Sequence, residues 1–140
     1  MKRWLFDTGP IVAYLDSSDS WHGRVVSTLD EFRGQIHTTS AVVVESMHLV
    51  GSAHEGPSLL ADFLEGSGAQ IRECTKIADL RAATELMRKY ADIPMDFADA
   101  TLVLLADELK ISEICTLDRR GFRAYRTSAG KHFSLVMEND

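Results

Sequence analysis

Residues 94–101 read Pro94-Met95-Asp96-Phe97-Ala98-Asp99-Ala100-Thr101, and residues 116–120 read Thr116-Leu117-Asp118-Arg119-Arg120. Asp96 and Asp99 are three positions apart, so they share one face at the start of a helix that continues through apolar residues to Leu109. The apolar residues that follow predict a strand, and Asp118 lies where this strand ends. Helix starts and the carboxyl ends of strands are the places where α/β folds bind their ligands.

Strand-like and helix-like segments alternate along the rest of the chain. We expect strands at residues 3–6, 35–38, 69–74, 112–117 and 133–137, the last at an edge of the sheet. We expect helices at residues 10–16, 21–32, 40–50, 57–66, 76–90 and 96–109, and a basic loop at 121–130. This order predicts one α/β domain over residues 1–140, with three α/β/α layers and a central parallel sheet of about five strands.

The charge of the chain is negative overall but uneven. A length of 140 residues suits one domain with a sizeable core, and a net charge of −6 argues against nonspecific binding to nucleic acid. The last third is different, because basic residues follow one another closely there: Arg119, Arg120, Arg123, Arg126 and Lys131. A basic strip beside an acidic pocket is therefore expected, with Arg119, Arg120 and Arg123 as candidates for contact with a phosphate backbone.

The composition also bears on location. The basic start of the chain is followed by three apolar residues before Asp7, which is too short for a signal peptide, and no apolar run approaches the length of a membrane span. Cys74 and Cys115 are far apart in apolar segments, so we expect buried thiols in a reducing, cytoplasmic compartment. The five histidines have no metal-binding spacing.

Two more acids are expected near the same edge of the sheet. Asp7 follows the first strand directly, and Glu45 lies one turn into the helix after the second strand. Five carboxylates at one edge would repel one another and raise each other's pKa, unless a cation binds between them. Oxygen ligands without paired Cys or His favour Mg²⁺ or Mn²⁺, and such ions activate water for the hydrolysis of a phosphodiester.

Each acid also has a structural interpretation. Asp7 and Asp118 suit turns, Asp96 and Asp99 suit a helix capping box, and Glu45 suits a polar helix face. Capping and metal ligation are equally good interpretations of Asp96. The case for a shared site therefore rests on the placement of the set.

Four segments of the sequence resemble the motifs of PIN domains. They are Leu5-Phe6-Asp7-Thr8-Gly9-Pro10-Ile11-Val12-Ala13, Thr39-Ser40-Ala41-Val42-Val43-Val44-Glu45, Asp99-Ala100 with the apolar helix after it, and Thr116-Leu117-Asp118-Arg119-Arg120-Gly121-Phe122. Each motif is loose alone, but the set covers nearly the whole chain in the right order and spacing. The short length further resembles the VapC-type toxins of toxin–antitoxin pairs.

This resemblance implies a function and a site. A PIN domain would be an endoribonuclease that depends on Mg²⁺ or Mn²⁺, and a VapC-type toxin would form a homodimer and be inhibited by an antitoxin. The acidic site would comprise Asp7, Glu45, Asp99 and Asp118, whereas the position of Asp96 is acidic in only part of the family. Thr8 and Thr116 would hold the first and fourth acids or a metal-bound water through their hydroxyls. The apolar residues of the first helix, Ile11, Val12, Tyr14 and Leu15, would be candidates for the dimer interface.

Three alternatives differ from the toxin at named positions. One is a PIN ribonuclease that processes RNA and is not a toxin. Another is a Mg²⁺-binding signalling module like a response-regulator receiver domain, which needs an acidic pair after the first strand, where this chain has Asp7 alone. The third is a phosphatase with an aspartate nucleophile, which needs a second aspartate where this chain has Gly9.

Overall fold

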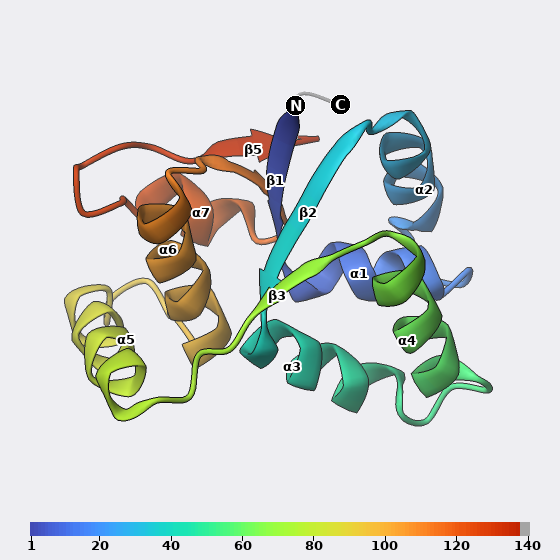
Figure 1. Ribbon diagram of the computed structural model, residues 1–140, viewed down its shortest axis with the longest axis horizontal. Coiled ribbons are helices and arrows are strands. Elements are labelled where there is room, and N and C mark those ends of the chain that lie inside the picture. Colours follow the sequence, from blue (N-terminus) through green and yellow to red (C-terminus); the bar gives the residue numbers. More distant parts are fainter. Residues whose placement is uncertain (138–140) are drawn as a thin grey trace.

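The computed structural model describes residues 1–137, which form five strands and seven helices (Figure 1). The strands are β1 (Lys2–Phe6), β2 (Gly34–Thr39), β3 (Gln70–Arg72), β4 (Glu113–Cys115) and β5 (Ser134–Val136). The helices are α1 (Thr8–Leu15), α2 (His22–Glu31), α3 (Ser40–Val50), α4 (Gly56–Gly66), α5 (Ile77–Lys89), α6 (Phe97–Leu109) and α7 (Arg119–Ala124).

The five strands form one parallel sheet in the order β3-β2-β1-β4-β5. β1 is the central strand, and its Leu5 pairs with His37 of β2 on one side and with Ile114 of β4 on the other. Because every strand runs the same way, all five carboxyl ends lie at one edge of the sheet. The predicted α/β class and the parallel five-stranded sheet are confirmed.

Helices cover both faces of the sheet. α1 packs against α2 and α4, while α5 packs against α6, which contacts β2 from the other side (Figure 1). α3 contacts α1, α4 and α6, and so bridges the two helical layers near the carboxyl edge. This arrangement is the predicted three-layer α/β/α architecture, and it brings the starts of α1, α3, α6 and α7 to the same edge as the strand ends.

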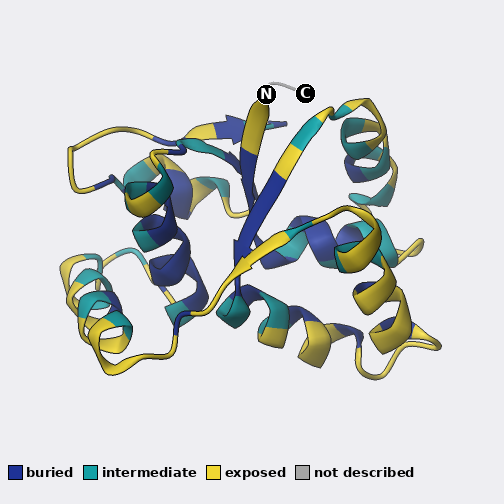
Figure 2. Ribbon diagram, in the orientation of Figure 1, coloured by how far each residue is buried: buried dark blue, intermediate teal, exposed yellow. Residues whose placement is uncertain are grey.

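The core is centred on β1 and α6. Leu5 and Phe6 are fully buried, and eight of the thirteen residues of α6 are buried, including Asp99 (Figure 2). A helix that is apolar over most of its circumference requires cover on several sides, which the sheet, α3 and α5 provide here. The burial of Asp99 is therefore a consequence of the helix on which it lies.

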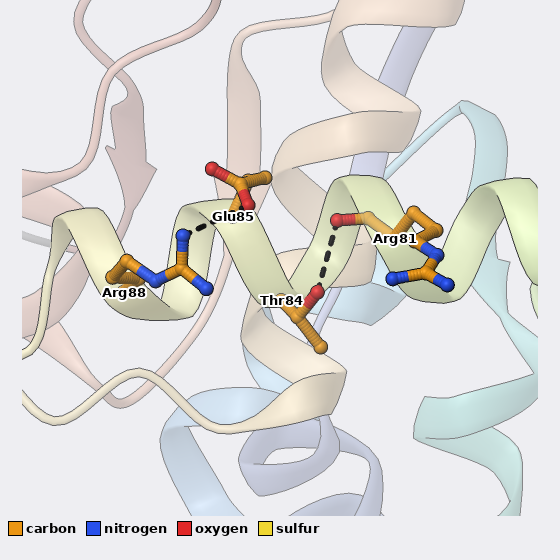
Figure 3. A network of polar contacts seen from close by, with 4 residues as sticks. All are labelled: Arg81, Thr84, Glu85 and Arg88. Atoms are coloured by element: carbon orange, nitrogen blue, oxygen red, sulfur yellow. Dashed lines mark hydrogen bonds and ion pairs between the residues drawn. The ribbon is translucent and has the colours of Figure 1, made fainter.

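α5 is amphipathic and forms the outer cover of α6. Its solvent side carries a salt bridge at 3.1 Å between Arg88 and Glu85, and the Thr84 hydroxyl donates a hydrogen bond to the Arg81 carbonyl (Figure 3). Both side chains of the salt bridge are largely exposed, so the pair contributes little to stability. The apolar side of α5, with fully buried Ala83, packs on α6.

Three predicted elements differ from the structure. Residues 121–130 were expected to form a loop, but α7 occupies Arg119–Ala124 because Asp118 caps it and Phe122 anchors it in the core. The strand predicted at 112–117 pairs over Glu113–Cys115, and that predicted at 69–74 pairs over Gln70–Arg72. Thr116 and Leu117 instead form the turn that leads into α7, so Asp118 starts a helix and does not end a strand.

Two expectations from composition can be compared with the described residues. In the described part of the chain, each helix is either too short or too polar to span a bilayer. Cys74 and Cys115 are buried and unpaired, as predicted.

Ile11 is fully buried within the chain, so its proposed place in a dimer interface on the first helix is wrong.

Candidate acidic active site

Asp7 lies at the centre of the carboxyl edge, between β1 and β4. Its backbone N–H donates to the carbonyl of Cys115 at 3.0 Å, which extends the pairing of the two strands by one residue. The chain leaves β1 toward β2 on one side and returns through β4 on the other, so this position is a topological switch point. Open α/β sheets form their ligand sites at such points.

Two hydrogen bonds fix the carboxylate of Asp7. One oxygen accepts from the backbone N–H of Thr8 at 2.8 Å and caps α1, and the other accepts from the Thr116 hydroxyl at 2.7 Å. The Thr116 hydroxyl oxygen in turn accepts from the backbone N–H of Asp118 at 3.0 Å. Thr116 therefore connects the first acid to the fourth, and Asp7 is held with only 7% of its surface exposed.

Asp96 and Asp99 form a reciprocal capping box at the start of α6. The Asp96 carboxylate accepts from the backbone N–H of Asp99 at 2.8 Å, and the Asp99 carboxylate accepts from the backbone N–H of Asp96 at 3.1 Å. The structural interpretation of both residues is thus correct. Asp96 is exposed, whereas Asp99 is buried and directed toward the other acids.

Asp118 is the cap of α7. Its carboxylate accepts from the backbone N–H of Gly121 at 3.1 Å, and the side chain is otherwise open to solvent. α7 can begin here because residue 121 has no side chain: a Cβ on Gly121 would lie 2.4 Å from Asp118 Oδ2. The position of the fourth acid therefore depends on a glycine three residues later.

Glu45 approaches the site from α3. It is half-buried, and its carboxylate accepts a hydrogen bond from the hydroxyl of Thr8, the residue next to Asp7. A polar face shared by Glu45 with His48 and Ser52 was the structural interpretation of this acid; His48 is exposed on α3, and Ser52 is exposed beyond the end of the helix. Glu45 is therefore turned inward toward Thr8 and does not share a solvated stripe with them.

The electrostatics of the acids are those of one group. Burial raises the pKa of Asp99 to about 8, and the charges of Asp7, Asp96 and Asp118 add to this effect. Burial also raises the pKa of Asp7 to about 6, with added contributions from Asp96 and Glu45, although hydrogen bonds from Thr116 and Thr8 oppose the increase. The two buried acids, Asp7 and Asp99, thus lie within the electrostatic influence of the other three predicted acids.

The donor set matches a hard divalent cation. It consists of carboxylate and hydroxyl oxygens, which Mg²⁺ and Mn²⁺ prefer. Within residues 1–137, no three acidic, Cys or His side chains are already gathered closely enough to enclose an ion. Each aspartate instead uses at least one oxygen to cap a helix or bind a threonine. Small side-chain rotations would therefore accompany metal binding, and the charge of the bound cation would offset the repulsion that adds to the effect of burial on the pKa of Asp99.

The arginines after Asp118 differ in their surroundings. The Arg119 guanidinium lies 5.1 Å from the centre of the Trp21 ring and donates to the Met137 carbonyl at 3.1 Å. Arg24 lies over the same ring at 5.0 Å and donates to the same carbonyl at 2.8 Å. Arg119 thus helps to fix the end of β5, whereas Arg120 and Arg123 are exposed beside the site.

Two residues near the acids were missed from the sequence. Tyr125 is fully buried, and its hydroxyl donates to the carbonyl of Pro94 at 3.1 Å. Gly121 lies against both this hydroxyl and the Asp118 carboxylate. The three-residue spacing of Phe122 and Tyr125 was the available signal, because it places two aromatic rings on one face of a helix within the stretch interpreted as a loop.

Comparisons with known proteins agree with this geometry. No protein-family model matches the sequence. The chain is 31% identical over 134 residues to ribonuclease VapC26 of Mycobacterium tuberculosis (strain ATCC 25618 / H37Rv), which covers 94% of this chain and 98% of that protein. The fold of this chain matches the crystal structure of the sarcin–ricin loop cleaving toxin VapC20 of Mycobacterium tuberculosis, with a TM-score of 0.74 and 20% identity. The match covers 84% of this chain and 91% of the VapC20 chain. The chain therefore belongs to the VapC family of PIN-domain toxin endoribonucleases.

Proposed function

We propose that the chain is the toxin of a toxin–antitoxin pair and hydrolyses RNA at the acidic site with Mg²⁺ or Mn²⁺. The observation that supports this most is the group of aspartates around Asp99, whose pKa is raised by burial and further by their charges. Such an arrangement costs stability unless a cation offsets the charge, so a functional reason is needed for its presence. The resemblance to a VapC ribonuclease over nearly the full length supplies the reaction class.

Asp7, Asp99 and Asp118 are the residues proposed to hold the ion, with Glu45 at the side of Asp7. When bound, the ion supplies a water of lowered pKa and stabilises the charge that develops on the leaving oxygen. The Thr116 hydroxyl connects the carboxylate of Asp7 to the backbone N–H of Asp118. Asp99 is protonated in part when the metal is absent and must release that proton on binding, so we propose that metal affinity rises with pH.

The first prediction concerns the stability of the metal-free protein. In the folded state the pKa values of Asp7 and Asp99 are raised from 3.8 to about 6 and about 8, so the folded state binds more protons than the unfolded state between these values. The free energy of unfolding should therefore fall as the pH rises from 4 to 8, and level off above it. Thermal melting across this pH range, without metal, measures the effect.

Added Mn²⁺ should reverse this loss. An ion that binds the folded state alone stabilises it by mass action, so millimolar Mn²⁺ is expected to raise the melting temperature most at pH 8 and to flatten the pH dependence. Asp7→Asn is the control, because it removes one proposed ligand charge. An equal Mn²⁺ shift in the wild type and in Asp7→Asn, or no shift in either, would count against a metal site here.

RNA binding is assigned to the exposed arginines beside Asp118. The net charge of −6 repels RNA, so attraction must be local. We expect Arg120→Gln with Arg123→Gln to weaken RNA binding and to flatten its salt dependence, while turnover at saturating RNA changes little. The distant exposed Arg81→Gln is the matched control, and an equal loss of binding in both proteins would exclude this assignment. A sarcin–ricin loop RNA is a suitable first substrate, since the structural neighbour is described as cleaving it.

The partners are proposed from apolar surfaces. A groove of about 530 Å³ between α1, α2 and α4 is lined by Tyr14, Leu15, Leu29 and Phe63, and it suits an apolar segment of an antitoxin. The same antitoxin would place a basic side chain in the anionic site, which would compete with the metal.

A homodimer is proposed through a second surface. A shallow hollow beside Glu45 and Asp96 is lined by Val44 and Phe97, and Val44 on α3 and Ile77 on α5 are each about 70% exposed. Apolar side chains this exposed suit burial against a partner, and Val44 lines the hollow itself. Sedimentation of the wild type as a monomer at micromolar concentration would contradict the homodimer, and Ile77→Glu should shift a true dimer toward monomer.

A further inference from the structure

Tyr125 joins two segments that carry the acids. It follows α7 directly, and its hydroxyl donates to the carbonyl of Pro94, two residues before Asp96. The bond spans 31 residues of sequence and connects the end of the Asp118 helix to the start of the Asp96–Asp99 capping box.

The hydroxyl of Tyr125 also faces the acids themselves. A Cβ on Gly121 would lie 2.9 Å from this hydroxyl and 2.4 Å from Asp118 Oδ2, so the hydroxyl and the carboxylate both lie close to the same glycine. Burial raises the pKa of Tyr125, and the charges of Asp99, Asp118, Asp96 and Asp7 raise it further. The phenol is therefore protonated at neutral pH and donates to the carbonyl of Pro94.

The ring of Tyr125 is fixed by other aromatic side chains. It meets Phe122 edge to face at 5.0 Å and Tyr90 at 5.1 Å, and Phe122 meets Phe133 at 5.4 Å. Such pairs have a preferred geometry, so the ring has little freedom to rotate or shift. The aromatic cluster thus fixes the position of the Tyr125 hydroxyl. Through its hydrogen bond, the hydroxyl in turn fixes the position of the Pro94 carbonyl.

We propose that Tyr125 is a positioning residue of the acidic site: its hydroxyl holds the segment bearing Asp96 and Asp99 at the distance from Asp118 at which both can bind one divalent cation. The proposal rests on the proposed metal-dependent function. Tyr125 acts through the carbonyl of Pro94 and is not itself a ligand of the ion or a contact of the RNA. Residues that orient metal ligands in this way typically change metal affinity by about 10–100-fold when they are removed.

The test compares Tyr125→Phe with Tyr90→Phe. Tyr90 belongs to the same aromatic cluster, and its hydroxyl accepts a hydrogen bond from the backbone N–H of Arg126 at 3.0 Å, so each variant loses one hydroxyl and one bond to the backbone. We expect similar small losses of melting temperature without metal. In calorimetric titration with Mn²⁺, Tyr125→Phe should bind about tenfold or more weakly, and Tyr90→Phe should bind like the wild type.

Turnover provides a second measurement. At saturating Mn²⁺, Tyr125→Phe should lower kcat for RNA cleavage and leave the KM for RNA unchanged, since the arginines that contact RNA are not altered. Tyr125→Phe that binds Mn²⁺ with wild-type affinity would overturn the positioning role, as would an equal weakening in Tyr90→Phe. A wild-type protein that does not bind Mn²⁺ would overturn the metal-dependent function, and this inference with it.

Discussion

Asp99→Asn is expected to lower RNA cleavage by roughly a hundredfold or more and, in the same protein, to raise the stability of the metal-free fold. The first effect follows because Asp99 is the buried acid on which the charges of Asp7, Asp96 and Asp118 converge. An amide keeps the shape of the side chain and can still accept from the backbone N–H of Asp96, but it removes the charge that would bind a cation.

The second effect has the opposite sign from that of most core substitutions. At pH 8 the folded protein must ionise a carboxyl whose pKa is raised to about 8, whereas the unfolded chain ionises it at its ordinary value of 3.8. A neutral amide escapes this cost, so Asp99→Asn should raise the free energy of unfolding at pH 8 by roughly 1–2 kcal/mol, allowing for relaxation and solvent screening. At pH 4 the gain should nearly vanish. A residue that is essential for turnover, and whose replacement stabilises the fold, is typical of an active site.

Asp107→Asn is the matched control for this experiment. Asp107 lies on the same helix, but its carboxylate accepts from the backbone N–H and the hydroxyl of Ser128, away from the acids. It should lose a little stability at both pH values and keep its activity. Asp99→Asn that cleaves RNA as fast as the wild type would refute the mechanism.

Asp96→Asn separates the two interpretations of the exposed capping residue. Asparagine is as good an N-cap as aspartate, so α6 should keep its stability. Unchanged cleavage would leave Asp96 with the structural role that its capping box already demonstrates. Reduced cleavage with an unchanged melting temperature would instead assign it to the metal or its bound water.

Regular patterns in the sequence were sufficient to predict the sheet and its covering helices. Strands such as Trp4-Leu5-Phe6 are continuous apolar runs, and α6 is apolar around most of its circumference. Their composition therefore predicts that they are buried on more than one side. The acids could be assigned to one edge for the same reason, because parallel strands share their carboxyl ends. What the strand and helix periods could not supply was the distance between side chains that arrive from separate elements.

α7 shows where this reasoning was insufficient. It has only six residues and one of them is glycine, so local propensity alone does not predict a helix there, although three of the six are arginine. The helix forms because of contacts that are distant in sequence: Phe122 packs on Phe133, and Tyr125 bonds to Pro94. Within this helix Arg119 lies against Trp21, whereas Arg120 and Arg123 are exposed, so the three arginines have different surroundings.

Gly121→Ala is expected to reduce RNA cleavage by at least tenfold while costing the fold only about 1–2 kcal/mol. The new Cβ would lie 2.4 Å from Asp118 Oδ2 and 2.9 Å from the Tyr125 hydroxyl, distances at which one of these groups must move. The Tyr125 ring is locked by its aromatic neighbours, whereas the carboxylate of Asp118 is at the end of an exposed side chain. Asp118 should therefore turn away, which is a small change for the fold and a large one for the site.

Gly23→Ala is the matched control, because it is the same substitution in another helix with no atom within 4 Å of the new Cβ. It should keep full activity and gain up to about 1 kcal/mol of stability from the better helix former. In Gly121→Ala, turnover and Mn²⁺ affinity should fall together, since both depend on the direction of the Asp118 carboxylate. If Gly121→Ala melts well below the wild type but cleaves RNA normally, the helix has moved as a unit around the new methyl group, and the close packing at residue 121 serves the fold and not the acidic site.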